Sequence, residues 1–225
     1  MMKQWWLMKR LWRRYALKLG RNGVQMLVFW KEKLVFLAVP KTGTTAIEGA
    51  LAPRASIVMR DPPVLKHSPV YRYNRYVEPF LTEAGGAEAM ETVAVVRHPV
   101  DWLSSWFRYR NRNELVGEPN STRDVSFNEF VLEYCREKPA SFANVGAQSK
   151  FLLRRRDQKL GVDHLFSYER PQSLYDFFEE RLQTKVETKR VNVSPDFKVH
   201  ISEEVESHYR EVHALEFSLW EMAKT

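Results

Sequence analysis

Residues 34–45, with the sequence LVFLAVPKTGTT, pass from an unbroken apolar run into a short polar loop. The run from 34 to 39 contains β-branched and aromatic side chains, which is typical of a strand buried on both faces. Pro40 ends the run because it has no N–H to donate to a neighbouring strand. Beyond the polar loop, Ile47 and Leu51 have the spacing of one helix face. This order predicts a strand, a tight loop and a helix.

A loop in this setting is a natural anion-binding site. It aims free backbone N–H groups and the positive end of the helix at a ligand. Gly43 lets a ligand approach the backbone closely, and Lys41 adds a mobile positive charge. Thr42, Thr44 and Thr45 add hydroxyl donors. The alternative is an ordinary polar turn with a capping threonine.

The loop differs from the phosphate-binding loop of nucleotide kinases, GxxxxGK[ST]. In that pattern the lysine follows the glycine. Here Lys41 precedes Gly43 by two residues, and the chain has no glycine at the upstream position.

Length and composition favour one α/β domain with a substantial core. The chain has 225 residues, of which 44% are hydrophobic. Its single cysteine, Cys135, excludes an intrachain disulfide and fits a reducing, cytoplasmic location. Cys135 lies in an apolar helical pattern, so a small buried residue is favoured over a nucleophile. No His and Cys spacing typical of a zinc site occurs, and no metal is expected.

The formal net charge of +7 comes from the N-terminal segment. Residues 1–25 hold no acidic residue and seven basic ones: Lys3, Lys9, Arg10, Arg13, Arg14, Lys18 and Arg21. The remainder holds 28 basic and 28 acidic residues, which argues against a nucleic-acid partner.

Residues 1–25 are predicted to form a basic amphipathic helix ahead of a domain at 26–225. Its apolar positions have helical spacing: Trp5, Met8, Trp12, Tyr15 and Leu19. The segment is too short to span a bilayer, and its charges exclude a signal peptide. Three alternatives stay open: peripheral contact with an anionic membrane, packing on the domain or a partner, or an upstream extension if translation starts at Met26. The last two are favoured.

The rest of the chain alternates predicted strands and helices. Residues 24–30 and 34–39 are predicted to form a hairpin turned at 31–33. Further strands are expected at 55–59, 92–96 and 164–167, with helices at 44–52, 100–107, 127–136, 147–156, 171–182 and 202–223. Residues 60–79 are predicted to be a loop or broken helix, and 111–126 a surface loop. This alternation predicts a mostly parallel sheet covered by helices on both faces, with ligands at the carboxyl ends of its strands.

A second motif, VAVVRHPVDWLSSWF, begins in the strand at 92–96. Arg97 stands at the strand end, and Ser105 follows eight residues later in the next helix. An arginine fork with a hydroxyl suits a phosphate group. Ser104 is the less favoured hydroxyl because one residue turns a helix by about 100°.

The two motifs together resemble the signature of sulfotransferases that use 3′-phosphoadenosine 5′-phosphosulfate (PAPS). The resemblance covers about residues 33–195, and the stretches NVGAQSKFL and RVNVSP are more similar to the carbohydrate-type and bacterial group than to the cytosolic aryl type. It implies a P-loop-like three-layer sandwich and transfer of a sulfuryl group to a hydroxyl, or less favourably an amine, of a small molecule or carbohydrate. The C-terminal RKGxxGxWK-like segment of the aryl type has no equivalent here, and Arg190, Asn192 and Ser194 are candidates for part of its role.

The resemblance also implies roles for individual residues. Lys41 would neutralise the leaving group, the loop residues Thr42, Gly43, Thr44 and Thr45 would hold the 5′ end, and Arg97 and Ser105 would hold the 3′-phosphate. His67 is the favoured general base, with Glu48 or Asp61 as alternatives, and His98 is expected to shape its turn. Four loop residues that mix aromatic and basic groups suit a sugar or anionic acceptor: Tyr71, Arg72, Tyr73 and Arg75. An ordinary surface loop is the open alternative for them. Gln148, Ser149 and Lys150, at the start of a predicted helix, are further candidates to face the acceptor or the nucleotide.

Two other functions compete with this interpretation. A P-loop phosphotransferase or nucleotide hydrolase would need the GxxxxGK[ST] lysine and a strand-end aspartate for magnesium. A non-catalytic relative would bind adenosine bisphosphate without turnover. The sequence names neither the acceptor nor the oligomeric state.

Overall fold

The computed structural model describes residues 26–60, 67–86, 88–188 and 199–223. Five strands form one open sheet in the order β3-β1-β2-β4-β5. Their bounds are Met26–Phe29 (β1), Leu34–Leu37 (β2), Ile57–Met59 (β3), Glu91–Val96 (β4) and His164–Ser167 (β5). Each strand lies within or next to a segment that the sequence predicted, because each is a short, largely apolar run.

The prediction of a mostly parallel sheet is wrong, because the sheet is mixed. β2 pairs with β4 and β4 with β5 in parallel, whereas β1 is antiparallel to both β2 and β3. The physical reason is the hairpin that the sequence did predict. Only four residues join β1 to β2, which is too short for the crossover that a parallel pair requires. β1 therefore enters the sheet reversed, between β2 and β3.

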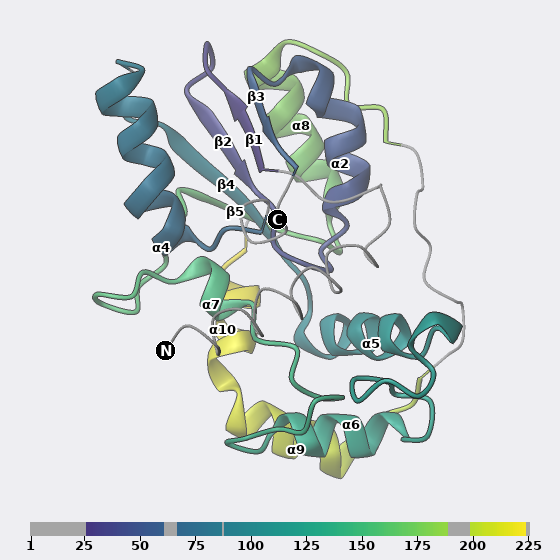
Figure 1. Cartoon of the computed structure of the whole chain (residues 1–225). Helices are drawn as coiled ribbons and strands as arrows, with labels where there is room; N and C mark the ends of the chain where they lie inside the picture. Colours follow the sequence, from purple (N-terminus) through teal and green to yellow (C-terminus); the bar gives the residue numbers. More distant parts are fainter. Residues whose placement is uncertain (1–25, 61–66, 87, 189–198, 224–225) are drawn as a thin grey trace, which may run out of the picture.

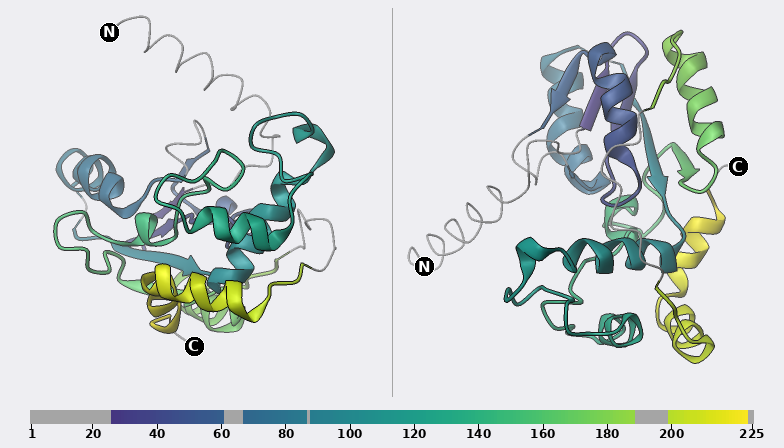
Figure 2. Two further views of the ribbon diagram at one scale, coloured as in Figure 1. Left: turned by 90° about the horizontal axis from the view of Figure 1, so that it is seen from below. Right: turned by 90° about the vertical axis from the view of Figure 1, so that its right-hand side faces the viewer.

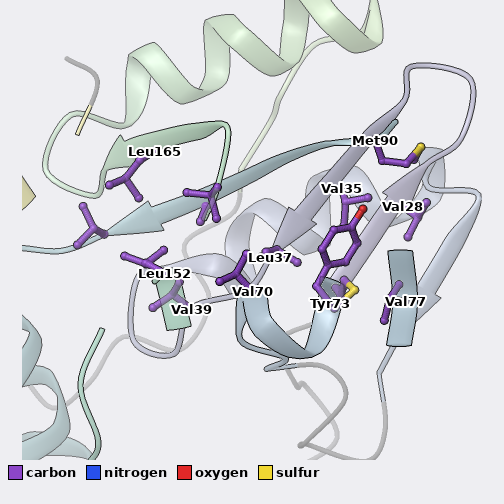
Figure 3. Packing of buried hydrophobic residues seen from close by; sticks show 14 of the residues in the cluster. Val28, Val35, Leu37, Val39, Val70, Tyr73, Val77, Met90, Leu152 and Leu165 are labelled. Atoms are coloured by element: carbon purple, nitrogen blue, oxygen red, sulfur yellow. The ribbon is translucent and has the colours of Figure 1, made fainter. Parts of the chain in front are cut away.

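Helices cover both faces of the sheet, as predicted (Figure 1). On one face α2 (Thr44–Leu51) and α8 (Pro171–Leu182) pack on one set of alternating strand residues, including Phe36, Val95 and Phe166. On the other face the helical segment of α4 (Val70–Arg72), η2 (Tyr73–Val77) and η3 (Phe80–Ala84) packs on the opposite set (Figure 3). The alternation follows from the two-residue period of a strand.

A third group of helices lies beyond the carboxyl ends of β2 and β4 (Figures 1 and 2). It contains α5 (Pro99–Arg110), α6 (Phe127–Tyr134), α9 (Glu203–Val212) and α10 (Ala214–Glu221), around a core of their own that includes Trp102, Phe130 and Tyr209. This placement puts α5 directly over the strand ends where a ligand was predicted. η4 (Asn113–Leu115) is a single turn in the predicted surface loop.

The predicted terminal helix at 202–223 is two helices. The chain bends at His213, and the buried residues of α10 are Glu216, Phe217 and Leu219. Leu215 and Met222, which a straight helix would have placed on the buried face, are exposed. The bend turns the Glu216 carboxylate toward the backbone N–H groups of residues 148 and 149. These two hydrogen bonds are a physical reason for the bend.

The helix predicted at 147–156 is also shorter than expected. α7 spans Ser149–Leu152 only, because Leu153 forms an isolated bridge with Leu160 and turns the chain back. The basic amphipathic helix predicted at 1–25 lies outside the described residues. Within the described ranges no helix combines the length and apolarity needed to cross a bilayer.

A candidate anion site at three strand ends

Three neighbouring strands finish at the candidate site. The loop of residues 40–45 follows β2, Arg97 follows β4, and Tyr168 follows β5. The backbone N–H of Tyr168 donates to Val96 O at 2.8 Å, so Tyr168 lies beside Arg97. The two predicted motifs also meet, because Arg97 Nη1 donates to Lys41 O at 3.3 Å across 56 positions of sequence.

The loop has a curled backbone that hydrogen bonds hold in place. Lys41 and Gly43 both have positive φ, +69° and +70°, a backbone shape that makes concave N–H surfaces. Thr42 is buried and its Oγ1 donates to Val39 O at 2.9 Å, so this hydroxyl shapes the loop. Trp102 on α5 donates from Nε1 to Pro40 O at 2.8 Å and ties the loop to the next helix.

The N-terminus of α2 faces the same place. Gly43 is its N-cap, and among the described residues no side chain caps it. The first N–H groups of a helix have no partner inside the helix, so those of Thr44 and Thr45 are available to a ligand. Thr44 is almost fully buried and Thr45 is half-buried.

Lys41 is surrounded by aromatic rings and other cations. Its Nζ lies 4.7 Å from the ring centroid of Tyr109 and 5.6 Å from that of Trp106, both on α5. Burial, reinforced by Arg112, Arg97 and Arg108, lowers the pKa of Lys41 to about 7. These neighbouring cations repel the charged form of Lys41, and a bound anion would offset that repulsion.

Arg97 is positioned by stacking. Its guanidinium carbon lies 4.3 Å from the ring centroid of Tyr168. Burial lowers the pKa of Arg97, although Tyr168 and Asp101 oppose that shift. Its Nε is buried and has no hydrogen-bond partner among the described residues. A phosphate oxygen is the kind of acceptor that would satisfy such a donor.

Gly43 and Tyr168 pack against each other, and this contact yields a stability prediction. A Cβ built on Gly43 would lie 2.6 Å from Tyr168 Cε2, and φ is +70°. We expect Gly43→Ala to lower the free energy of unfolding by about 2 kcal/mol, because it combines backbone strain with overlap. Urea denaturation measures the change.

Gly49 in the interior of α2 provides the matched control, since a Cβ there meets nothing within 4 Å. Gly49→Ala is expected to raise the free energy of unfolding by about 0.5–1 kcal/mol. Combining Gly43→Ala with Tyr168→Ala removes the overlap, so the double variant should lose less than the sum of the single losses. Equal effects of Gly43→Ala and Gly49→Ala would contradict this account.

The predicted phosphate-binding serine lies on α5. Ser104 and Ser105 are both nearly buried, with 4% and 5% of their surface exposed, so burial does not separate them. The choice of Ser105 stays a prediction.

The predicted general base lies at the end of β2. His67 Nδ1 is 2.9 Å from Ala38 O. A carbonyl oxygen only accepts, so Nδ1 carries the hydrogen, and in the neutral ring Nε2 is the basic nitrogen. Glu48, the alternative base, is buried on α2. Asp61 lies outside the described residues.

Several residues predicted to face a ligand do other work. Tyr73 is 1% exposed and belongs to the core under β2, so its assignment to an acceptor surface is wrong. Gln148 does not point at a ligand, because its amide forms hydrogen bonds with the backbone of Arg97.

His98 shapes its turn as expected: its backbone N–H donates to Glu169 Oε1 at 2.8 Å, and its ring contacts Trp220. Arg190, Asn192 and Ser194 lie outside the described residues.

The structure adds residues that the sequence reasoning missed. Tyr168 follows a predicted strand directly, so the rule that ligands gather at strand ends was a usable signal for it. Arg108 lies on α5 and Arg112 in the loop that follows it, so no helical spacing linked the two residues to Lys41. Trp102 carried no such signal, because its bond to Pro40 O depends on tertiary structure.

Comparison with protein-family models, with curated proteins and with solved structures found no match. The described residues contain no group of three or more His, Cys, Asp or Glu side chains arranged to hold a metal ion.

Proposed function

We propose that this protein transfers a sulfuryl group from PAPS to a hydroxyl acceptor. The observation that carries the proposal is the contact between the two motifs. Arg97 reaches Lys41 O at 3.3 Å, so a loop suited to one anionic group and an arginine suited to another occupy adjacent strand ends. PAPS carries two such groups, the 5′-phosphosulfate and the 3′-phosphate. The resemblance of the same two motifs to PAPS-dependent sulfotransferases supports the same reaction.

In this proposal the loop residues hold the 5′ end through the N–H groups of Gly43, Thr44 and Thr45. Arg97 and Ser105 hold the 3′-phosphate. The acceptor oxygen forms a bond to sulfur while the bond from sulfur to the bridging oxygen of adenosine 3′,5′-bisphosphate breaks. Lys41 neutralises the charge that develops on that oxygen, as positioned cations do in phosphoryl transfer. The acceptor proton passes to His67 Nε2.

The lowered pKa of Lys41 has a consequence for binding. With a pKa of about 7, this lysine is only partly charged at neutral pH in the free protein. A bound anion favours the charged form, so binding is accompanied by proton uptake above pH 7. We expect the affinity for adenosine 3′,5′-bisphosphate to decrease as the pH rises from 7 to 9. Titration calorimetry in buffers of different ionisation enthalpy measures the proton uptake.

The first test of the proposed function is a thermal-shift titration. Adenosine 3′,5′-bisphosphate at 100 times its dissociation constant should stabilise the protein by about 2.7 kcal/mol, or about 5–10 °C for a chain of this size. ATP with magnesium is the comparator. Turnover is then measured with PAPS and a panel of hydroxyl acceptors in the presence of EDTA.

Each result has a clear meaning. Stabilisation by the bisphosphate and metal-independent turnover would support the sulfotransferase. Stabilisation by ATP with magnesium alone would favour the phosphotransferase instead. Binding of the bisphosphate without turnover on any acceptor would favour a non-catalytic binding protein.

A further inference from the structure

The backbone between β4 and α5 is held by side chains from distant parts of the chain. β4 ends at Val96 and α5 begins at Pro99, and the carbonyl of His98 accepts from Trp102 N in α5 at 2.8 Å. The two backbone groups of Arg97 and the N–H of His98 have no such partner in a strand or helix. Buried backbone groups without partners are costly, and other groups must satisfy them. Glu169 accepts from the N–H of His98 at 2.8 Å. Gln148 satisfies both backbone groups of Arg97.

The Gln148 amide acts as a two-way clamp. Its Oε1 accepts from Arg97 N at 2.9 Å, and its Nε2 donates to Arg97 O at 2.8 Å. An amide side chain carries an acceptor oxygen beside a donor nitrogen, so it can pair with both the N–H and the C=O of one residue. A neighbouring strand would pair with the same two groups. Gln148 is fully buried, so water does not replace these bonds.

A buried carboxylate in turn holds the backbone of Gln148. Glu216 on α10 accepts from Gln148 N at 2.9 Å and from Ser149 N at 3.0 Å. Glu216 is 3% exposed, and burial raises its pKa. A buried acidic group is retained at a cost, and here its two oxygens fix the start of α7 and with it the position of Gln148.

We propose that Gln148, held by Glu216, is a positioning residue that sets the direction of the Arg97 side chain toward the 3′-phosphate. The chain of contacts runs from α10 to residues 148 and 149, then to the Arg97 backbone, and from its guanidinium to Lys41 O and the Tyr168 ring. This inference rests on the proposed function, because it assigns the 3′-phosphate to Arg97. It accounts for a buried glutamine and a buried glutamate that the proposed reaction does not itself use.

The test compares two nucleotides that differ only in the 3′-phosphate. Gln148→Met keeps the volume and removes both bonds to Arg97. We expect it to weaken binding of adenosine 3′,5′-bisphosphate about tenfold and to change binding of adenosine 5′-phosphate less than about twofold. A purely structural role would weaken both nucleotides equally. Calorimetry is performed at a temperature at which circular dichroism shows each variant to be folded.

A second variant keeps the test decisive if Gln148→Met does not fold. Glu216→Gln retains the shape of the side chain but replaces one acceptor oxygen with an NH2 group. One of the two backbone N–H groups then faces a donor and loses its hydrogen bond. It should weaken the bisphosphate about threefold and spare the 5′-phosphate. Glu221→Gln makes the same chemical change at an exposed position of the same helix and should alter neither affinity.

The outcomes separate the two proposals. If wild type does not prefer the bisphosphate over the 5′-phosphate, the proposed function and this inference both fail. If wild type has the preference, Arg97→Met loses it and the Gln148 and Glu216 variants keep it, the positioning role alone is overturned. Loss of the preference in all three variants supports the positioning role.

Discussion

Lys41→Met is expected to lower the rate of sulfuryl transfer about a thousandfold. The substitution keeps the length of the side chain and removes the charge that we propose neutralises the leaving group. Loss of a single positioned group that stabilises developing charge typically costs a factor of this size. Steady-state turnover of PAPS with a working acceptor measures it. Lys138→Met, at an exposed lysine, is the matched control.

The same substitution should make the free protein more stable. Lys41 has a pKa of about 7 in the folded protein against a model-peptide value of 10.5, so folding opposes its protonation. Below pH 7 both states carry the proton and the folded state bears the full cost of the buried charge. Between pH 7 and 10.5 the unfolded state binds more protons, so wild-type stability rises with pH.

We therefore expect Lys41→Met to raise the free energy of unfolding by about 2 kcal/mol at pH 6, with the gain fading toward pH 10. Urea denaturation at a series of pH values measures the difference between the two proteins. A destabilised variant that still turns over substrate would contradict both the burial of the charge and its role.

Arg97→Met is expected to weaken adenosine 3′,5′-bisphosphate about a hundredfold. A bidentate guanidinium–phosphate contact is worth about 3 kcal/mol, which corresponds to that factor. Adenosine 5′-phosphate should lose less than about threefold, because it lacks the group that Arg97 is proposed to hold. Titration calorimetry of both nucleotides gives the two dissociation constants.

Two further variants sharpen this prediction. Arg97→Lys keeps the positive charge but loses the paired donors of the guanidinium, so its affinity should lie between those of Arg97→Met and wild type. Arg136→Met removes an exposed arginine on a distant loop and should change neither constant. Equal weakening of both nucleotides by Arg97→Met would show that Arg97 supports the site as a whole and does not bind the 3′-phosphate.

The sequence alone determined the elements whose cause is local. The apolar runs predicted β2, β4 and β5, and Pro171 at the first turn predicted the start of α8. Gly43 predicted where the loop turns, whereas β2 ends at Leu37, two residues before the strand end that Pro40 predicted. These features depend on periodicity, on the missing N–H of proline and on the freedom of glycine, all of which are readable within a few residues.

Tertiary structure alone decided how those elements meet. The pairing of β1 with β3, the bend at His213 and the contact of Arg97 with Lys41 all depend on residues far apart in the chain. Gln148 illustrates the reason. Its amide suits a ligand or a backbone equally well, and only the unpaired groups of Arg97 beside it select the backbone. The lowered pKa of Lys41 likewise arises from burial and from cations brought together by folding, which no local pattern contains.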